Sequence, residues 1–473
     1  MRQLQRIVAV MFAALLFAAS AAAQEAKGDW EGTLQVNPTI KLRLAVHIVA
    51  GADGKLAGTM DSIDQGAFGI PLAAVAQGES ALSFDVPAVA GRYEAKWDAS
   101  AKGWAGTWHQ SGMSWPLLFT PHAPTPPPPP LPVTWEIPKD EAIAALIDTR
   151  IAARPGEGIV IGVIDPAGRR IVGRGPAGAK PFDNDTIFEI GSMSKVFTSL
   201  LLADMAVRGE VSLDDPAAKY LPTGAHLPER GGRQITLRDL ATHSSGLPRL
   251  PDNMPFGNPA NPYADYTEAM LLDFLGRYQL TRDIGSKYEY SNLGVGLLGY
   301  LLARRAGTSY EILLKQRILG PLGMADTAIT LTAAQKARFA QGHDATMQPA
   351  LAWDLPSLAG AGAIRSTARD MLTFLEAVIG LRRTPLGQAF MVMLAERRPG
   401  VAPKVQTGLA WMVAGTPRGE IIFHDGGTGG FRTTMAFDPA KRRGVIVLTN
   451  AAREPSSNDL AIHLLIGSPV AAP

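Results

Sequence analysis

Two residues whose side chains could take part in catalysis, a serine and a lysine, lie three positions apart in a largely apolar stretch. Ser192 and Lys195 belong to the sequence FEIGSMSKVFTSLL, residues 188–201, and follow Gly191. If the stretch is helical, residues three apart lie on one face with Cβ atoms ~5–6 Å apart. Burial among apolar neighbours lowers the pKa of a lysine, and a neutral lysine can take the proton of a serine hydroxyl. Lys195 would then activate Ser192 as a nucleophile; the alternative is an ordinary N-cap serine beside a lysine that reaches water.

Residue types and motifs that are absent from the sequence exclude several classes of functional site. The chain has no cysteine, which excludes disulfides, thiolate metal ligands and a lipidated N-terminal cysteine. Neither a His-Glu-x-x-His zinc motif nor a Gly-x-Ser-x-Gly elbow occurs in the sequence. We therefore expect no metal and no nucleotide or other cofactor. With 45 basic and 43 acidic residues, the chain gives no reason to expect a nucleic-acid partner.

The N-terminus, residues 1–23, has the pattern of an export signal. Arg2 and Arg6 precede the apolar run IVAVMFAALLFA, and small residues lead to a predicted cleavage after Ala23. A retained anchor is the alternative, but the run is too short for a comfortable membrane span. We expect a periplasmic or secreted protein with no transmembrane anchor after cleavage. Its 473 residues exceed the ~100–200 residues of a typical domain.

Residues 24–120 are predicted to form a small all-β domain, a barrel or sandwich. Short, partly alternating runs such as IKLRLAVHIV and RYEAKWD are separated by turn signals such as GADGK. The stretches GDWEGTL and GTMDSIDQG resemble a small β-barrel module attached to some secreted bacterial hydrolases. Residues 121–134 follow as a proline-rich linker, extended as polyproline II. Five tryptophans of the domain could line a ligand cavity, but we expect core and rim packing: Trp30, Trp97, Trp104, Trp108 and Trp115.

Residues 135–473 mix strands and helices in an order that indicates an α+β fold. GIVIGVID and RRIVGRG have the pattern of a β-hairpin, and the Ser192 segment follows as a helix. A helix- and loop-rich stretch comes next, before the chain returns to strands in EIIFHDGG, FRTTMAFD and GVIVLTN. We predict one antiparallel sheet, closed by the two ends of this region, flanked by helices and accompanied by a helical subdomain.

Five stretches, in order, resemble the landmarks of one enzyme family. FEIGSMSK resembles the active-site segment of class C β-lactamases, and AVRGEVSLDDPAAKYLP resembles the segment that follows it in the same family. LRDLATHSSGLP, then YEYSNLGVGLLGYLL with a Tyr-x-Asn motif, then HDGGTGGFRTTMAFDPAKRRGVIVLTN follow. Over roughly residues 140–470, the chain is similar to class C β-lactamases, to related D-alanyl-D-alanine carboxypeptidases and penicillin-binding proteins, and to esterases of the same fold.

The resemblance implies a serine hydrolase that opens the amide of a β-lactam through an acyl-Ser192 intermediate. A D-Ala-D-Ala carboxypeptidase or endopeptidase, or a carboxylesterase, would use the same residues and differ in pocket shape and deacylation rate. A non-catalytic binding protein is a third alternative, against which the complete set of Ser192, Lys195, Tyr290 and Asn292 argues. The partner would be a small molecule or a peptidoglycan peptide, and the oligomeric state is left open.

The resemblance also implies a role for each site residue. Tyr290 would shuttle protons between Ser192, the leaving group and the deacylating water. A nearby lysine ammonium would push this phenol toward its phenolate; the alternative is a core tyrosine at the start of a helix. Asn292 would hydrogen-bond Lys195 and the substrate amide. The backbone N–H groups of Ser192 and Gly427 would form an oxyanion hole.

One motif departs from the family pattern. His424-Asp425-Gly426 stands where the family usually has Lys-Thr-Gly, whose lysine places a positive charge beside the substrate carboxylate. A histidine, with an unperturbed pKa of about 6.5, is only partly charged at neutral pH. The substitution therefore weakens the β-lactam prediction but leaves the acyl-serine mechanism untouched. Gly426 would let the backbone approach the substrate closely, Asn450 would lie near the substrate carboxylate, and His243 would have a structural role.

Overall fold

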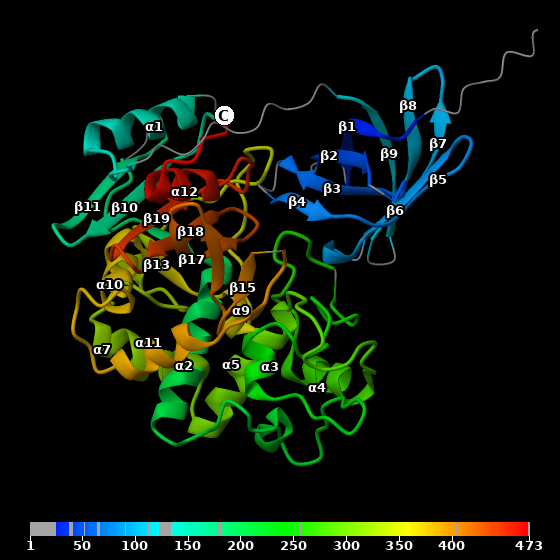
Figure 1. Cartoon of the computed structure of the whole chain (residues 1–473). Helices are drawn as coiled ribbons and strands as arrows, with labels where there is room; N and C mark the ends of the chain where they lie inside the picture. The colour runs from blue at the N-terminus through cyan, green and yellow to red at the C-terminus, as the bar shows by residue number, and fades with distance from the viewer. Residues whose placement is uncertain are drawn as a thin grey trace, which may run out of the picture. The chain divides into compact units, whose positions relative to one another are not determined.

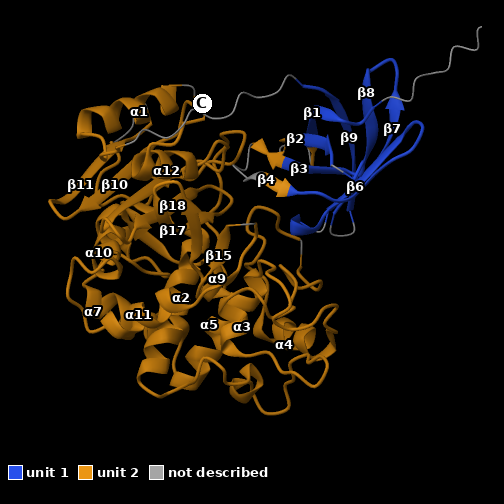
Figure 2. Ribbon diagram, in the orientation of Figure 1, with its two compact units in different colours: residues 1–34, 45–60, 71–123 blue, residues 35–44, 61–70, 124–473 orange. Residues whose placement is uncertain are grey.

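A computed structural model describes most of the chain (Figure 1). The described residues are 25–36, 41–51, 53–63, 67–89, 91–110, 113–122, 134–152, 154–176, 181–255, 257–402 and 404–471. The predicted export signal and most of the predicted linker lie outside them. Figure 2 colours two compact units, one of residues 1–34, 45–60 and 71–123, the other of residues 35–44, 61–70 and 124–473. The boundaries expected at residues 24–120 and 135–473 remain predictions.

The N-terminal part contains one nine-stranded sheet with the strand order β4-β3-β2-β1-β9-β8-β7-β6-β5. The two edge strands β4 and β5 follow each other in the chain, so the sheet curls into a nearly closed barrel. The all-β prediction is confirmed. The strands are β1 (Gly28–Gln35), β2 (Lys41–Ala50), β3 (Leu56–Ser62), β4 (Ala67–Pro71), β5 (Ala73–Gln77), β6 (Ala81–Val86), β7 (Gly91–Asp98), β8 (Gly103–Gln110) and β9 (Met113–Pro121).

Aromatic side chains fill the interior of this sheet. Alternate residues of β6 and β7 are buried, as expected when one face of a strand packs on a core. The rings of Trp30, Trp97 and Trp104 meet edge to face, with centroids 5.3–6.0 Å apart. Trp108 is buried and Trp115 is half-buried. These contacts favour the expected packing role for the tryptophans.

The remainder of the chain is built on an eight-stranded sheet with the order β11-β10-β19-β18-β17-β16-β15-β14. Each neighbouring pair is antiparallel. Strand β10 pairs with β19, placing Ile159 opposite Thr449, so the two ends of this region close the sheet as predicted. The strands are β10 (Ile159–Asp165), β11 (Gly168–Arg174), β14 (Arg398–Pro399), β15 (Val405–Thr407), β16 (Met412–Thr416), β17 (Gly419–Gly427), β18 (Arg432–Asp438) and β19 (Arg443–Thr449).

Helices cover both faces of this sheet (Figure 1). α1 and α12 pack on one face through a cluster that includes Ile143, Ile161 and Leu464. α2 and α10 belong to the larger core on the other face, which confirms the α+β prediction. The helices are α1 (Asp140–Ala152), α2 (Ser194–Val207), α3 (Leu237–Ala241), α4 (Glu268–Arg277), α5 (Asn292–Ala306), α6 (Tyr310–Leu314), α7 (Gly320–Leu322), α8 (Ala333–Lys336), α9 (Ala359–Gly362), α10 (Ala368–Val378), α11 (Gly387–Ala395) and α12 (Asn458–Ile466).

Helix α2 lies inside the molecule rather than on its surface. The residues from Ser194 to Met205 are all buried, which is the state expected of a helix that is apolar on nearly every side. A short two-stranded sheet of β12 (Ile187–Glu189) and β13 (Arg365–Thr367) holds the chain just before this helix. Ser192 is therefore placed by a strand on one side and a buried helix on the other.

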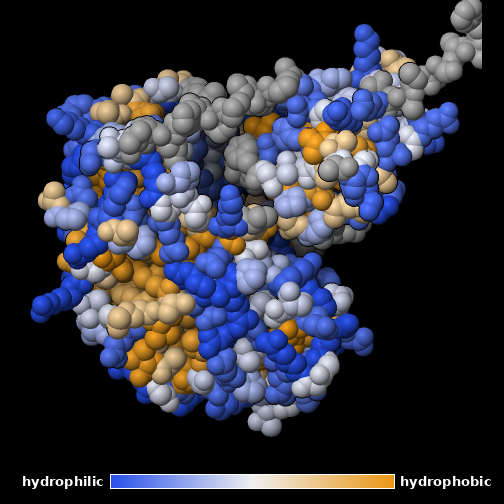
Figure 3. All heavy atoms as spheres, viewed as in Figure 1, coloured by the Kyte–Doolittle hydropathy of each residue, from blue (hydrophilic) through white to orange (hydrophobic). Residues whose placement is uncertain are grey.

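The visible surface mixes hydrophilic and apolar residues (Figure 3). Apolar residues gather over α11, where the Met391 side chain is exposed. Among the described residues, no helix has the length and apolarity needed to cross a bilayer.

Candidate active site

The turn that carries Ser192 is shaped by a glycine. Gly191 begins a single 3-10 turn, Gly191–Met193, and has a φ of +50°, in the left-handed region that favours glycine. A Cβ at this position would lie 2.6 Å from the backbone nitrogen of Gly427. The end of β17 therefore packs directly against the nucleophile's turn. Ser192 itself is half-buried, so a substrate can reach its hydroxyl.

Lys195 is the base that the sequence predicts for Ser192. Its side chain is fully buried, and its amino nitrogen lies 2.9 Å from Ser192 Oγ and donates a hydrogen bond of 2.7 Å to the carbonyl of Ala361. Burial lowers the pKa of Lys195 well below its usual value; the charge of Arg249 lowers it further, and Asp425 opposes the shift. A neutral amine with one N–H bound to Ala361 can direct its lone pair at the serine proton, so the predicted activation is supported.

The phenol ring of Tyr290 lies next to the Lys195 amine. The Lys195 nitrogen is 4.9 Å from the centroid of the phenol ring. Burial raises the pKa of Tyr290, while hydrogen bonding to Ser192 lowers it. The expected push toward the phenolate was wrong, because the lysine is too deeply buried to be a strong cation and the phenol is itself desolvated. Tyr290 is a neutral phenol and can donate a proton.

His243 holds the segment that contains Tyr290. Its backbone has a φ of +56°, and its ring stacks on that of Tyr290 with centroids 4.5 Å apart. The ring nitrogen Nδ1 accepts from the Ser291 N–H at 3.1 Å, and the carbonyl accepts from Glu289 N–H at 2.8 Å. Burial lowers the pKa of His243 well below 6.5, so the ring is neutral. These contacts agree with the structural role expected for this histidine.

Asn292 makes a different contact from the one predicted. Its amide nitrogen donates to the Tyr263 hydroxyl at 3.0 Å, and no bond to Lys195 occurs among the described residues. The Asn292 Oδ1 atom is buried and has no partner in the described part of the chain. A buried acceptor without a partner carries a desolvation cost, and a substrate N–H would relieve it. The expected hydrogen bond by which Asn292 would orient the lysine is therefore not supported by the geometry.

The end of β17 packs against the segment that carries Ser192. A Cβ at Gly426 would lie 2.0 Å from the carbonyl of Ile190, so only glycine permits this approach. Gly427 follows at the exposed end of the strand. Ser192 and Gly427 thus lie on two segments that contact each other. This placement supports the prediction that their N–H groups form an oxyanion hole.

His424 does not carry the charge expected of it. The side chain is 1% exposed, and its Nδ1–H donates to the backbone carbonyl of Asp425 at 2.6 Å. Burial lowers the pKa of His424 to about 4; the charge of Asp425 opposes this shift and Lys195 adds to it. The imidazole is consequently neutral at pH 7 and cannot attract a substrate carboxylate by charge.

Asn450 is not available to the substrate either. Its Oδ1 accepts from the Gly158 N–H at 2.7 Å, and its amide nitrogen donates to the Gln341 carbonyl at 2.7 Å and lies 3.2 Å from His343 Nδ1. The side chain is buried. These bonds join β19 to two distant loops, so the expected contact between Asn450 and a substrate carboxylate is not supported by the geometry.

Two charged residues at the site were missed by sequence reasoning. Asp425 raises the pKa values of both Lys195 and Tyr290 by its negative charge. Arg249 places its guanidinium carbon 5.0 Å from the Tyr290 ring centroid. Asp425 was visible as the middle residue of the His-Asp-Gly motif, whereas Arg249 follows the SGLP stretch and had no signal beyond that position.

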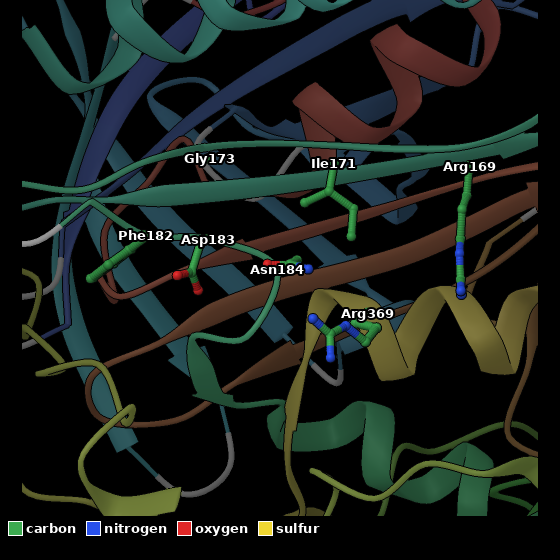
Figure 4. A pocket seen from close by; sticks show the side chains of 7 residues that line it. All are labelled: Arg169, Ile171, Gly173, Phe182, Asp183, Asn184 and Arg369. Carbon is green, nitrogen blue, oxygen red and sulfur yellow. The ribbon is translucent and has the colours of Figure 1, made fainter.

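A pocket of about 460 Å³ lies between β11 and the start of α10 (Figure 4). It shares no residue with the candidate site. Its two arginines are already paired, Arg169 with Glu376 and Arg369 with Asp185, so we assign it no chemistry. It is lined by Arg169, Ile171, Gly173, Phe182, Asp183, Asn184 and Arg369.

A serine, a buried lysine and a neutral tyrosine at one site define an acyl-transferring serine hydrolase. A sequence model of the Beta-lactamase family matches residues 143–466, and the chain belongs to this family. It is 31% identical over 346 residues to the D-alanyl-D-alanine-carboxypeptidase/endopeptidase AmpH of Escherichia coli (strain K12), covering 67% of this chain and 87% of AmpH.

Two solved structures show the same fold. The class C β-lactamase from Rhodobacter sphaeroides matches with a TM-score of 0.60 and 28% identity, over 69% of this chain and 98% of that one. The β-lactamase/D-alanine carboxypeptidase from Yersinia pestis, complexed with citrate, matches with a TM-score of 0.56 and 28% identity, over 65% and 93% of the two chains. The resemblance to this family and the predicted fold are confirmed, and the protein is a serine hydrolase.

Proposed function

We propose that the protein hydrolyses the terminal amide of D-alanyl-D-alanine peptides through an acyl-Ser192 intermediate. The observation that carries this proposal is the 2.9 Å contact between Ser192 Oγ and the fully buried Lys195 amine. The similarity to AmpH, named as a carboxypeptidase/endopeptidase, supports the choice of substrate.

The reaction uses three groups of this site in turn. Neutral Lys195 takes the Ser192 proton as Oγ attacks the substrate carbonyl, and the resulting oxyanion accepts hydrogen bonds from the N–H groups of Ser192 and Gly427. Tyr290 donates a proton to the leaving nitrogen, the C–N bond breaks, and Lys195 returns its proton to the phenolate. Water then loses a proton to Lys195 and attacks the acyl carbon, and Ser192 leaves with that proton.

β-Lactams are the second candidate substrate. Their ring amide is opened by the same steps, and the 28% identity to a class C β-lactamase supports this reading. Short esters would be cleaved by the same nucleophile, because an alkoxide is an easier leaving group than an unprotonated amide nitrogen. The predicted export signal, in residues 1–23 outside the described residues, supports a periplasmic or secreted location, where peptidoglycan peptides are accessible.

The test compares three substrates on one preparation. An N-acylated D-Ala-D-Ala peptide, a chromogenic cephalosporin and a p-nitrophenyl ester are assayed with the wild-type protein, with Ser192→Ala and with Ser199→Ala. Ser199 is a matched control, since it is buried on the same helix and its hydroxyl has no hydrogen-bond partner among the described residues. We expect Ser192→Ala to lose activity by on the order of 10³-fold or more, and Ser199→Ala to keep it.

The relative rates decide between the substrates. Faster turnover of the peptide than of the cephalosporin supports the carboxypeptidase, and the reverse order supports the β-lactamase. Full activity of Ser192→Ala on all three substrates would remove the nucleophile from the proposal.

A further inference from the structure

Arg249 is an exposed cation beside the proton-donating phenol. Its guanidinium carbon lies 5.0 Å from the centroid of the Tyr290 ring, and the side chain is exposed. No ion pair or side-chain hydrogen bond joins it to any other residue that the structure describes. Its backbone, by contrast, is held firmly, because its carbonyl accepts from the N–H groups of Asn292 and Leu293 at 3.0 and 3.2 Å.

The other basic groups around Ser192 are unavailable to an anion. Lys195 is fully buried and already bound to Ser192 and Ala361. His424 is buried, and its Nδ1–H is taken by a backbone carbonyl. Arg432, next to the end of β17, donates to the carbonyls of Thr428 and Phe431 and pairs with Glu454. Among the described residues around Ser192, Arg249 therefore stands out as a positive charge without an ion pair.

The position of Arg249 matches one group of the proposed substrates. In a D-alanyl-D-alanine peptide, and in a β-lactam, the carboxylate is attached to the carbon next to the leaving nitrogen. Tyr290 must approach that nitrogen to protonate it, so the carboxylate lies on the same side of the site as Tyr290. A guanidinium binds a carboxylate through two parallel N–H donors, and Arg249 has its donors free.

We propose that Arg249 binds the carboxylate of the leaving group and so selects acidic over neutral acyl donors. The proposal rests on the proposed function. Asp425 makes this role more necessary, because its charge acts on Lys195 and Tyr290 and would repel a second carboxylate. In this chain the substrate-binding cation would come from the loop between α3 and α4, whereas the histidine on β17 is neutral.

The test compares a matched substrate pair with three variants. An acyl-D-Ala-D-Ala peptide and the corresponding acyl-D-Ala-D-alaninamide differ only in the terminal charge. kcat/KM is measured for both with Arg249→Gln, Arg249→Lys and the control Arg305→Gln. Arg305 lies at the other end of α5 and donates to the carbonyl of Glu210. Because Arg249 also affects Tyr290, the acid-to-amide ratio is the readout, since an effect on the phenol alone changes both substrates equally.

We expect Arg249→Gln to lower the acid-to-amide ratio about 10-fold, equivalent to ~1.4 kcal/mol. Arg249→Lys should retain part of the preference, because it keeps the charge but not the two parallel donors, and Arg305→Gln should change nothing. An unchanged ratio in Arg249→Gln overturns the carboxylate role while leaving the hydrolase intact. If the wild-type protein cleaves neither peptide, yet a neutral fluorophosphonate labels Ser192, both the peptide substrate and the role of Arg249 are rejected.

Discussion

The buried, neutral imidazole of His424 allows a quantitative prediction of how the free energy of unfolding depends on pH. His424 has its pKa lowered to about 4 in the folded protein, against about 6.5 in an unfolded chain. Between these two values the unfolded state binds more protons than the folded state. The free energy of unfolding therefore falls as the pH drops through this window. Above pH 6.5 the contribution is fully present, and below pH 4 it is lost.

The size of the effect follows from the two pKa values. Between pH 7 and pH 5, protonation of the unfolded histidine should lower the free energy of unfolding by about 2 kcal/mol. In His424→Gln this loss is absent, since glutamine does not titrate. The variant gives up the bond from Nδ1–H to the Asp425 carbonyl, which is worth about 1 kcal/mol. Wild type should thus be the more stable at pH 7, and the variant at pH 5.

Urea unfolding of both proteins at pH 7, 6 and 5 measures this directly. Acid titration of the carboxylates is common to the two proteins, so it cancels in the difference between them. His226 is exposed, and His226→Gln serves as the control for removing a histidine at the surface. A difference for His424→Gln that stays constant from pH 7 to pH 5 would refute the reasoning, because it would mean that the buried ring is protonated in the folded state.

Three further perturbations test the site. Gly191→Ala should lose most kcat and about 2–4 kcal/mol of stability, since the Cβ meets Gly427 at 2.6 Å; in the control Gly209→Ala, φ is also positive but nothing lies within 4 Å, so only the backbone strain should appear in thermal unfolding. Lys195→Arg should lower kcat by roughly 10²–10⁴-fold on every substrate, because arginine cannot accept the serine proton; steady-state kinetics from pH 6 to 9 would contradict this if activity returned at high pH. His243→Leu should reduce kcat more than KM, as Tyr290 loses its stacked support; equal changes in both would reject a positioning role.

The nucleophile and the fold could be predicted because their signals are local. The sequence predicts a serine and a lysine three apart on one helix. In the structure Ser192 lies in the 3-10 turn that leads into α2, and the three-residue spacing still brings it within 2.9 Å of Lys195. The closure of the sheet by both ends of the region followed from the order of the strand patterns. The contact between Ser192 and Lys195 needed only their local spacing, and the closure of the sheet needed only the order of the strand patterns along the chain.

The failed expectations all depended on long-range contacts. The charge of His424 is decided by how completely other segments cover it, and the amide of Asn450 is taken by Gly158 and Gln341. The unpaired state of Arg249 is equally invisible in the sequence, because it depends on which acidic residues fold nearby. Residue type at a motif position thus predicted location well and electrostatic state poorly.

The pairing of β10 with β19 bears on how the protein reaches its folded state. Ile159 lies opposite Thr449, so this contact closes a loop of roughly 300 residues, at an entropic cost of about 5 kcal/mol. Contacts of such high sequence separation slow folding. A chain emerging from the ribosome or from a translocon would hold an unpaired β10 edge until its last strand appeared, and exposed edges invite aggregation. Truncation just before β19 should therefore yield an insoluble chain, even though Ser192, Lys195 and Tyr290 would all be present.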